Sequence, residues 1–240
     1  MKKKYFFEPH IGSAYHSGCG PYGKKILVLG SCFYCPCVYG DKACMECTDI
    51  NKKDSSKYDT SCKIYQPLGR VLHDEPSYNI KEKPKAYQNL AKAIGKIIGT
   101  TSYDQTWSYL AFTNYVQFFL PAADEFYRGA SSADLSPRDF DAFIEIVRKL
   151  QPHVVIVCGC IINKPVMNNE YLCDKDMLEQ TQGYVCHLEI PGIPHRISVI
   201  NPYHPSSSAW YTGLNSFQQD LTAEPVSYTH LRAHETGAYL

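Results

Sequence analysis

Runs of apolar residues that stop at glycine or at a polar loop recur along this chain. Residues 26–29 are aliphatic and lead into Gly30 without a polar break, as in a strand that is buried on both faces. Further strands are predicted at residues 108–114, 153–158 and 196–200, with a peripheral one at 184–190. Because open α/β sheets bind ligands at the carboxyl ends of their strands, the pattern predicts a site at residues 30–34.

Two stretches between these runs have the apolar spacing of amphipathic helices. The first covers residues 84–99, with Pro84 suited to a first turn and Gly99 to an end. The second begins after Ser136, a residue type that caps helices, and continues to residue 150. Strands therefore alternate with helices, which favours an α/β fold.

Composition and charge fit a globular protein. The 240 residues are 44% apolar and 20% charged, and we expect one domain over residues 1–224. No apolar run approaches the roughly 20 residues of a membrane span, and no signal peptide is recognised at the start, so we expect a cytoplasmic protein. The formal net charge is zero, so any contact with nucleic acid requires a local basic face.

The last stretch, residues 226–240, continues no period, cap or turn of the preceding sequence. It reads VSYTHLRAHETGAYL and resembles the translation of a sequencing-library adaptor. We therefore expect the natural chain to be interrupted near Glu224, and His230 and His234 receive no functional interpretation.

The chain has eleven cysteines, and a reducing compartment disfavours disulfides. Residues 35–83 are expected to form a long irregular insertion, which is either disordered or held by a bound group. Candidate ligands for a structural zinc or an iron–sulfur cluster are Cys35, Cys37, Cys44 and Cys47, with Cys62 as a substitute. The alternative is a set of partly buried thiols.

Three strand ends carry the residues that suggest a function. They are Gly30 to Tyr34 (GSCFY), Phe112 to Asn114 (FTN) and His204 to Ser207 (HPSS). In this order they resemble the uracil-DNA glycosylase superfamily, most closely bacterial uracil-glycosylase-like proteins whose first motif reads roughly GESHYC. The resemblance covers residues 23 to about 224.

The resemblance implies a three-layer α/β/α sandwich around a central, mainly parallel four-stranded sheet. It also implies a monomeric enzyme that acts on single- or double-stranded DNA, without a cofactor for its chemistry. Such an enzyme extrudes uracil or another damaged base and cleaves its N-glycosidic bond in base-excision repair.

The first motif departs from the family pattern. Some members have an acidic residue in this loop that activates water, and Cys32 stands at its position, while the related bacterial group has Glu where Ser31 stands. Neither residue is a carboxylate here, so the activity is expected to be weak or lost. Gly30, Ser31 and Phe33 are assigned to the base pocket, and Tyr34 matches the aromatic residue that excludes the thymine methyl group.

The two later strand ends carry the catalytic expectation. Asn114 matches the asparagine that reads uracil, and its amide offers a donor and an acceptor to O4 and N3–H. His204 matches the histidine that faces the C2 carbonyl, where negative charge collects as the bond breaks. Ser206, Ser207 and the backbone near Gly159 are expected to bind the flanking phosphates.

Two alternatives stay open. Residues 30–33 (GSCF) also resemble the opening motif of the GSCFA hydrolases, in which Ser31 would attack an ester with His204 as its base. A catalytic acid is expected shortly before that histidine, but Asn201 and Tyr203 occupy this space without supplying one. The second alternative is a non-catalytic nucleic-acid-binding module that keeps a metal-held loop.

Overall fold

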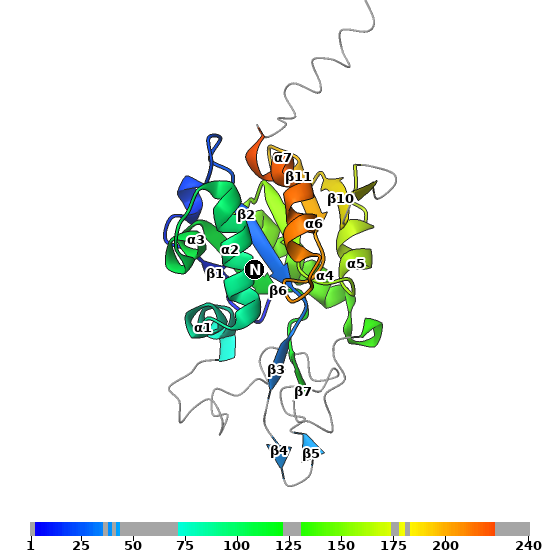
Figure 1. Ribbon diagram of the computed structural model, residues 1–240. Helices are drawn as coiled ribbons and strands as arrows, with labels where there is room; N and C mark the ends of the chain where they lie inside the picture. The colour runs from blue at the N-terminus through cyan, green and yellow to red at the C-terminus, as the bar shows by residue number, and fades with distance from the viewer. Residues whose placement is uncertain are drawn as a thin grey trace, which may run out of the picture.

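A seven-stranded sheet forms the centre of the protein in the computed structural model, which describes residues 3–35, 38–39, 42–43, 72–121, 131–173, 178–180 and 183–223 (Figure 1). The strands follow the order β1-β6-β2-β8-β11-β10-β9. Their bounds are β1 His10–Ile11, β2 Ile26–Gly30, β6 Leu110–Asn114, β8 Val154–Val157, β9 Leu178–Gln180, β10 Gly183–Leu188 and β11 Ile197–Asn201. Two small two-stranded sheets lie outside it, formed by β3 Phe33–Cys35 with β7 Phe119–Pro121 and by β4 Val38–Tyr39 with β5 Lys42–Ala43.

The four central strands, β6, β2, β8 and β11, are mutually parallel. They are the four that the apolar runs predicted, and the side chains of β2 from Ile26 to Leu29 are fully buried. The expected four-stranded sheet is nevertheless too small, because β1, β10 and β9 extend it with antiparallel pairs. Strand β6 begins two residues later than predicted because helix α3, Tyr103–Tyr109, precedes it.

Helices cover both faces of this sheet. Figure 1 shows α2 and α6 in front of the strands and α4 behind them. The helices are α1 Glu75–Glu82, α2 Lys85–Ile98, α3 Tyr103–Tyr109, α4 Pro137–Leu150, α5 Asn163–Met167, α6 Trp210–Ser216 and α7 Gln218–Thr222. The two predicted amphipathic helices are confirmed as α2 and α4. Gly99 ends α2 with φ +80°, and Ser136 and Asp139 form a reciprocal capping box at the start of α4.

Two irregular segments carry defined structure, and the expectation for the second is wrong in part. In residues 12–23, Tyr15 is fully buried and its hydroxyl donates to Leu150 O at 3.3 Å. The insertion expected over residues 35–83 ends in ordered structure, a 3₁₀ turn at Leu72–Asp74 followed by α1.

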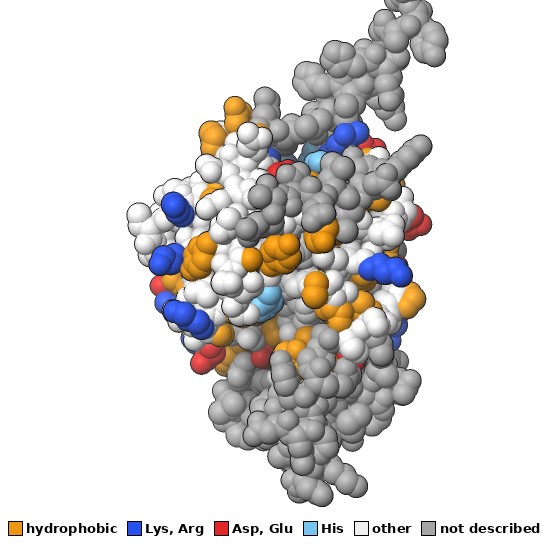
Figure 2. All heavy atoms as spheres, turned by 45° about the vertical axis from the view of Figure 1, so that its right-hand side comes forward, with side chains coloured by type: hydrophobic (Ala, Val, Ile, Leu, Met, Phe, Trp, Pro, Cys, Tyr) orange, Lys and Arg blue, Asp and Glu red, His pale blue; other side chains and the backbone are white. Residues whose placement is uncertain are grey.

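The metal prediction falls largely outside the described residues. Cys37, Cys44, Cys47 and Cys62 lie there, as does the adaptor-like segment 226–240, whereas Cys35 is buried in β3. Within the described ranges no three His, Cys, Asp or Glu side chains are grouped as metal ligands, and no helix is long and apolar enough to cross a membrane. The surface shown in Figure 2 carries charged side chains of both signs.

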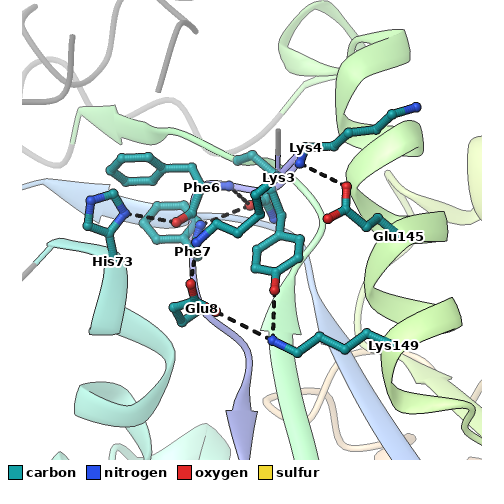
Figure 3. Close-up of polar contacts among 10 residues, drawn as sticks. Lys3, Lys4, Phe6, Phe7, Glu8, His73, Glu145 and Lys149 are labelled. Carbon is teal, nitrogen blue, oxygen red and sulfur yellow. Dashed lines mark hydrogen bonds and ion pairs between the residues drawn. The ribbon is translucent and has the colours of Figure 1, made fainter. Parts of the chain in front are cut away.

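Residues 3–8 form an N-terminal strap that ties three distant elements together (Figure 3). The backbone N–H groups of Phe6 and Phe7 both donate to Gln117 Oε1, at 2.9 and 3.1 Å. At its ends, Lys4 N donates to Glu145 of α4 at 2.8 Å and Glu8 N donates to His73 O at 2.8 Å. The strap thereby links the entry to α1 with the loop that follows β6 and with α4.

Candidate functional site

Strand β2 is the point at which the chain changes the direction in which it adds strands to the sheet. The chain passes from β2 to β6 on one side, then crosses back to β8 and β11 on the other. A crevice at the carboxyl ends of the strands is expected at such a switch point. A cavity of about 590 Å³ lies there, lined by Val28, Gly30, Ser31, Cys32, Phe33, Tyr34, Glu75, Asn79, Ala86, Tyr87, Leu90, Phe112, Asn114, Cys158, Gly159, Cys160, Ile161, His204 and Pro205. This size is within the usual range of small-ligand pockets.

Asn114 is the last residue of β6, and its side chain lies deep in this cavity. It is 3% exposed, and its carboxamide forms no hydrogen bond with any residue that the structure describes. Gly30 is its register partner on β2, and a methyl group at position 30 would collide with Asn114 Oδ1. Glycine at this position therefore provides the space in which the carboxamide lies.

Backbone hydrogen bonds join the first motif to the loop after Asn114. Tyr115 N donates to Gly30 O and Val116 N donates to Ser31 O, both at 2.9 Å. Gln117 Nε2 donates to Asn114 O at 2.7 Å, using the side chain that also binds the N-terminal strap. Asn114 is thus anchored through its backbone, while its side chain lines the cavity.

Asn201 organises the third motif. It is 1% exposed, and its Nδ2 donates to Gly159 O at 2.8 Å while its Oδ1 accepts from Tyr203 N at 2.9 Å. Tyr203 has φ +69°, a conformation that bulky residues rarely adopt. Asn201 therefore joins the loops after β8 and β11 and shapes the turn that presents His204.

His204 is exposed and lies at the rim of the cavity. Its contacts with Ser206 determine which ring nitrogen carries the hydrogen. Ser206 N donates to His204 Nδ1 at 3.2 Å, and the Ser206 hydroxyl contacts the same nitrogen at 2.6 Å. Because a backbone N–H only donates, Nδ1 is the acceptor and the neutral ring carries its hydrogen on Nε2. Desolvation lowers the pKa of His204, which favours this neutral form.

The rest of the first motif forms one wall of the cavity. Ser31 Oγ lies 2.8 Å from where a Cβ of Gly159 would stand. Tyr34 and Cys32 are half-buried, while Phe33 packs mainly into the core, with its ring 4.8 Å from that of Phe7.

The other predicted phosphate contacts make local hydrogen bonds. The Ser206 hydroxyl is paired with His204, and Ser207 Oγ accepts from Ala209 N at 3.2 Å. Their loop is tied to α2 because Asn89 Nδ2 donates to Pro205 O at 3.1 Å. Both serines accordingly lie directly after His204 and Pro205, which line the cavity.

Sequence reasoning missed the contribution of α1 and α2 to the cavity. Glu75 and Asn79 line it from α1, and Tyr87 lines it from α2. Asn79 Nδ2 donates to Glu75 Oε1 at 2.9 Å, and Glu75 is only 6% exposed. An acidic residue before Pro76 is an ordinary helix-start signal, so nothing in the local sequence marks Glu75 as part of a site.

No protein-family model matches this chain, and no curated protein matches it significantly. The fold and the cavity are therefore the basis for any functional conclusion. They define an α/β protein with a mainly apolar cavity, into which a few polar side chains project, at the carboxyl ends of a mainly parallel sheet.

Proposed function

We propose that this protein is a DNA glycosylase of the uracil-DNA glycosylase type, which cleaves the N-glycosidic bond of uracil or another damaged base. The observation that carries the proposal is the Asn114 carboxamide, which is buried, lines the cavity and has no hydrogen-bond partner in the described part of the chain. This carboxamide offers both a donor and an acceptor to a molecule in the cavity, so a base that can pair with both is favoured over one that lacks either. The edge of uracil presents both at O4 and N3–H.

His204 supplies the second part of the chemistry. When the glycosidic bond breaks, its electron pair moves onto the base and negative charge collects at the C2 oxygen. The neutral ring with hydrogen on Nε2 donates toward that oxygen, and such a donor contributes most in the transition state. Tyr34 lies at the same cavity, where it restricts the space beside C5 of the base.

The hydrolase alternative has one supporting feature, the place of Ser31 in the cavity. Against it, His204 is hydrogen-bonded to Ser206 and not to Ser31 in the described structure, and Asn201 holds the loops together in place of a catalytic acid. Labelling of Ser31 by a covalent serine-hydrolase probe would favour this alternative. A non-catalytic module would bind DNA and leave every base in place.

The test is single-turnover cleavage of uracil-containing single- and double-stranded oligonucleotides, with abasic sites revealed by alkali. We expect the purified protein to form abasic sites at uracil. Asn114→Ala removes both base-reading hydrogen bonds, and His204→Ala removes the donor to the leaving base. Each variant is expected to lower the rate by about a hundredfold or more.

Matched controls are available elsewhere on the surface. Asn168 and His16 are both exposed and do not line the cavity, so Asn168→Ala and His16→Ala are expected to retain the wild-type rate. A folded wild-type protein that leaves uracil intact in both kinds of DNA contradicts the proposal.

A further inference from the structure

One acidic side chain, Glu75, stands among the described residues that line the cavity. It is 6% exposed, and carboxylates are rarely buried to this extent unless they are paired or serve a function. It comes from α1, outside all three strand-end loops. The walls around it include Tyr87, Leu90 and Phe112, so it faces a largely apolar space in which few other groups can accept a proton.

Two sets of contacts hold Glu75 in place. Asn79, one turn later in α1, donates through Nδ2 to Glu75 Oε1 at 2.9 Å and to Glu75 O at 3.0 Å. The turn before the helix is held by the N-terminal strap, because His73 Nδ1 donates to Phe6 O at 3.0 Å and Glu8 N donates to His73 O. Both the backbone and the carboxylate of Glu75 are therefore fixed.

Tyr87 lies within electrostatic range of both Glu75 and the first motif. Burial is the main cause that raises the pKa of the Tyr87 phenol, and Cys158, Tyr103, Glu75 and Cys32 add to it electrostatically. Glu75 and Cys32 thus both lie within electrostatic range of one phenol that lines the cavity. The carboxylate and the first motif line the same cavity, Glu75 from α1 and Ser31 and Cys32 from the loop after β2.

We propose that Glu75 is the general base that activates the attacking water, an inference that rests on the proposed glycosylase function. Water forms a bond from its oxygen to C1′ of the deoxyribose while the bond from C1′ to the base nitrogen breaks. The water proton passes to the Glu75 carboxylate, and the bond electrons leave with the base, whose C2 oxygen faces His204. The products are an abasic sugar and, after protonation of the leaving nitrogen, the free base.

This assignment explains how a first motif without a carboxylate is compatible with catalysis. Neither Ser31 nor Cys32 is a carboxylate or a histidine, the side chains that serve most readily as general bases at neutral pH. A purely structural role for Glu75 predicts something different. As the first residue of α1 it would stabilise the helix N-terminus, and its replacement would change stability without changing the chemical step.

The first experiment compares Glu75→Gln with wild type in single-turnover cleavage of a uracil-containing duplex across pH 4.5–8. The variant keeps the size and the hydrogen-bonding reach of the side chain. We expect its rate to fall by roughly 10²- to 10⁴-fold and to lose the decrease at low pH that protonation of Glu75 causes in the wild type. Binding of an uncleavable duplex with 2′-fluoro-deoxyuridine is expected to change less than threefold. Glu82→Gln, an exposed glutamate of the same helix, is the control.

Chemical rescue is the second experiment. Glu75→Ala leaves space for a small carboxylate, so added sodium formate is expected to restore cleavage at least tenfold, whereas sodium chloride at equal ionic strength is expected to have no effect. Rescue measures the chemical step in the molecules that fold, so it remains informative if Glu75→Gln is unstable.

The outcomes separate the two proposals. An inactive wild type overturns the glycosylase function and the role of Glu75 with it. An active wild type whose Glu75→Gln variant cleaves at the same rate with the same pH profile, or whose Glu75→Ala variant ignores formate, overturns the role of Glu75 alone.

Discussion

The contact between Gly30 and Asn114 shows how one missing side chain shapes the site. The two residues are register partners at the carboxyl ends of neighbouring parallel strands. A Cβ at Gly30 would occupy the place of Asn114 Oδ1, so the strand-ending glycine makes room for the group that is proposed to read the base. Glycine is needed here because it lets the Asn114 side chain approach the backbone of β2 closely. Gly30 does not adopt a positive φ.

Gly30→Ala is therefore expected to displace the Asn114 carboxamide, with two effects. Uracil cleavage falls by about a hundredfold or more, and overpacking lowers the free energy of unfolding by about 1–3 kcal/mol. Urea unfolding and single-turnover assays measure these effects. In Gly30→Ala/Asn114→Ala the colliding oxygen is gone, so the stability cost of the first substitution should largely disappear. If the losses in unfolding free energy of the two single variants simply add in the double variant, the methyl group added at position 30 collides with some other group.

At the scale of elements, two faces of α2 line two different hollows. Its inner face contributes Tyr87 and Leu90 to the cavity. Its outer face lines a second hollow of about 820 Å³, with lysines at 85, 92 and 96. These lysines give a protein of zero net charge a local basic face, which the proposed binding to DNA would require.

Replacing Lys85, Lys92 and Lys96 by serine is expected to weaken DNA binding and to reduce its salt dependence. Each lost phosphate contact lowers the slope of log K against log salt by about 0.9 for duplex DNA. Fluorescence anisotropy between about 50 and 200 mM salt measures this slope, and the single-turnover rate at saturating protein should not change. Lys164→Ser, on the exposed surface of α5, is the control. An unchanged slope in the triple variant would place the DNA elsewhere.

Elements whose signals are local could be predicted from the sequence. The boundaries of α2 and α4 are set by Pro84, Gly99 and the Ser136 capping box, all readable within one turn of the chain. Helix α3 was missed because its seven residues are largely polar or aromatic and carry no apolar stripe. Glu75 was missed for a different reason. Its approach to the cavity depends on tertiary packing of α1, in a span whose scattered apolar residues indicated an irregular loop.

For the whole molecule, stability is expected to depend on a histidine pair at the end of the sheet opposite the cavity. His153 and His195 stack with their ring centroids 4.1 Å apart, and His153 Nδ1 accepts from Lys25 N at 3.0 Å. Burial lowers the pKa of His153 to about 4, and His195, Lys25 and Lys24 add to this shift. The folded protein therefore holds this ring neutral.

The sign of the pH effect follows from this lowered pKa. In the unfolded chain His153 titrates near 6.5, so between about pH 6.5 and 4 the unfolded state binds a proton that the folded state does not. Stability should therefore fall as the pH is lowered through this window, by less than the full pKa shift would give because the ring is only half-buried. His153→Gln keeps an acceptor for Lys25 N–H and should flatten the dependence in urea unfolding at pH 7.5, 6 and 5. An equal slope in both proteins would assign the effect to other groups.

The N-terminal strap has a consequence for how the protein is made. Phe6 bonds to a residue 111 positions further along the chain, and Lys4 to one 141 positions further. During synthesis the strap leaves the ribosome well before its partners Gln117 and Glu145. Until these emerge the strap can bond to the turn at His73, but its anchors on α4 and on the loop after β6 form late in folding. Such long-range closure also favours slow refolding, with aromatic residues of the strap exposed in the interval.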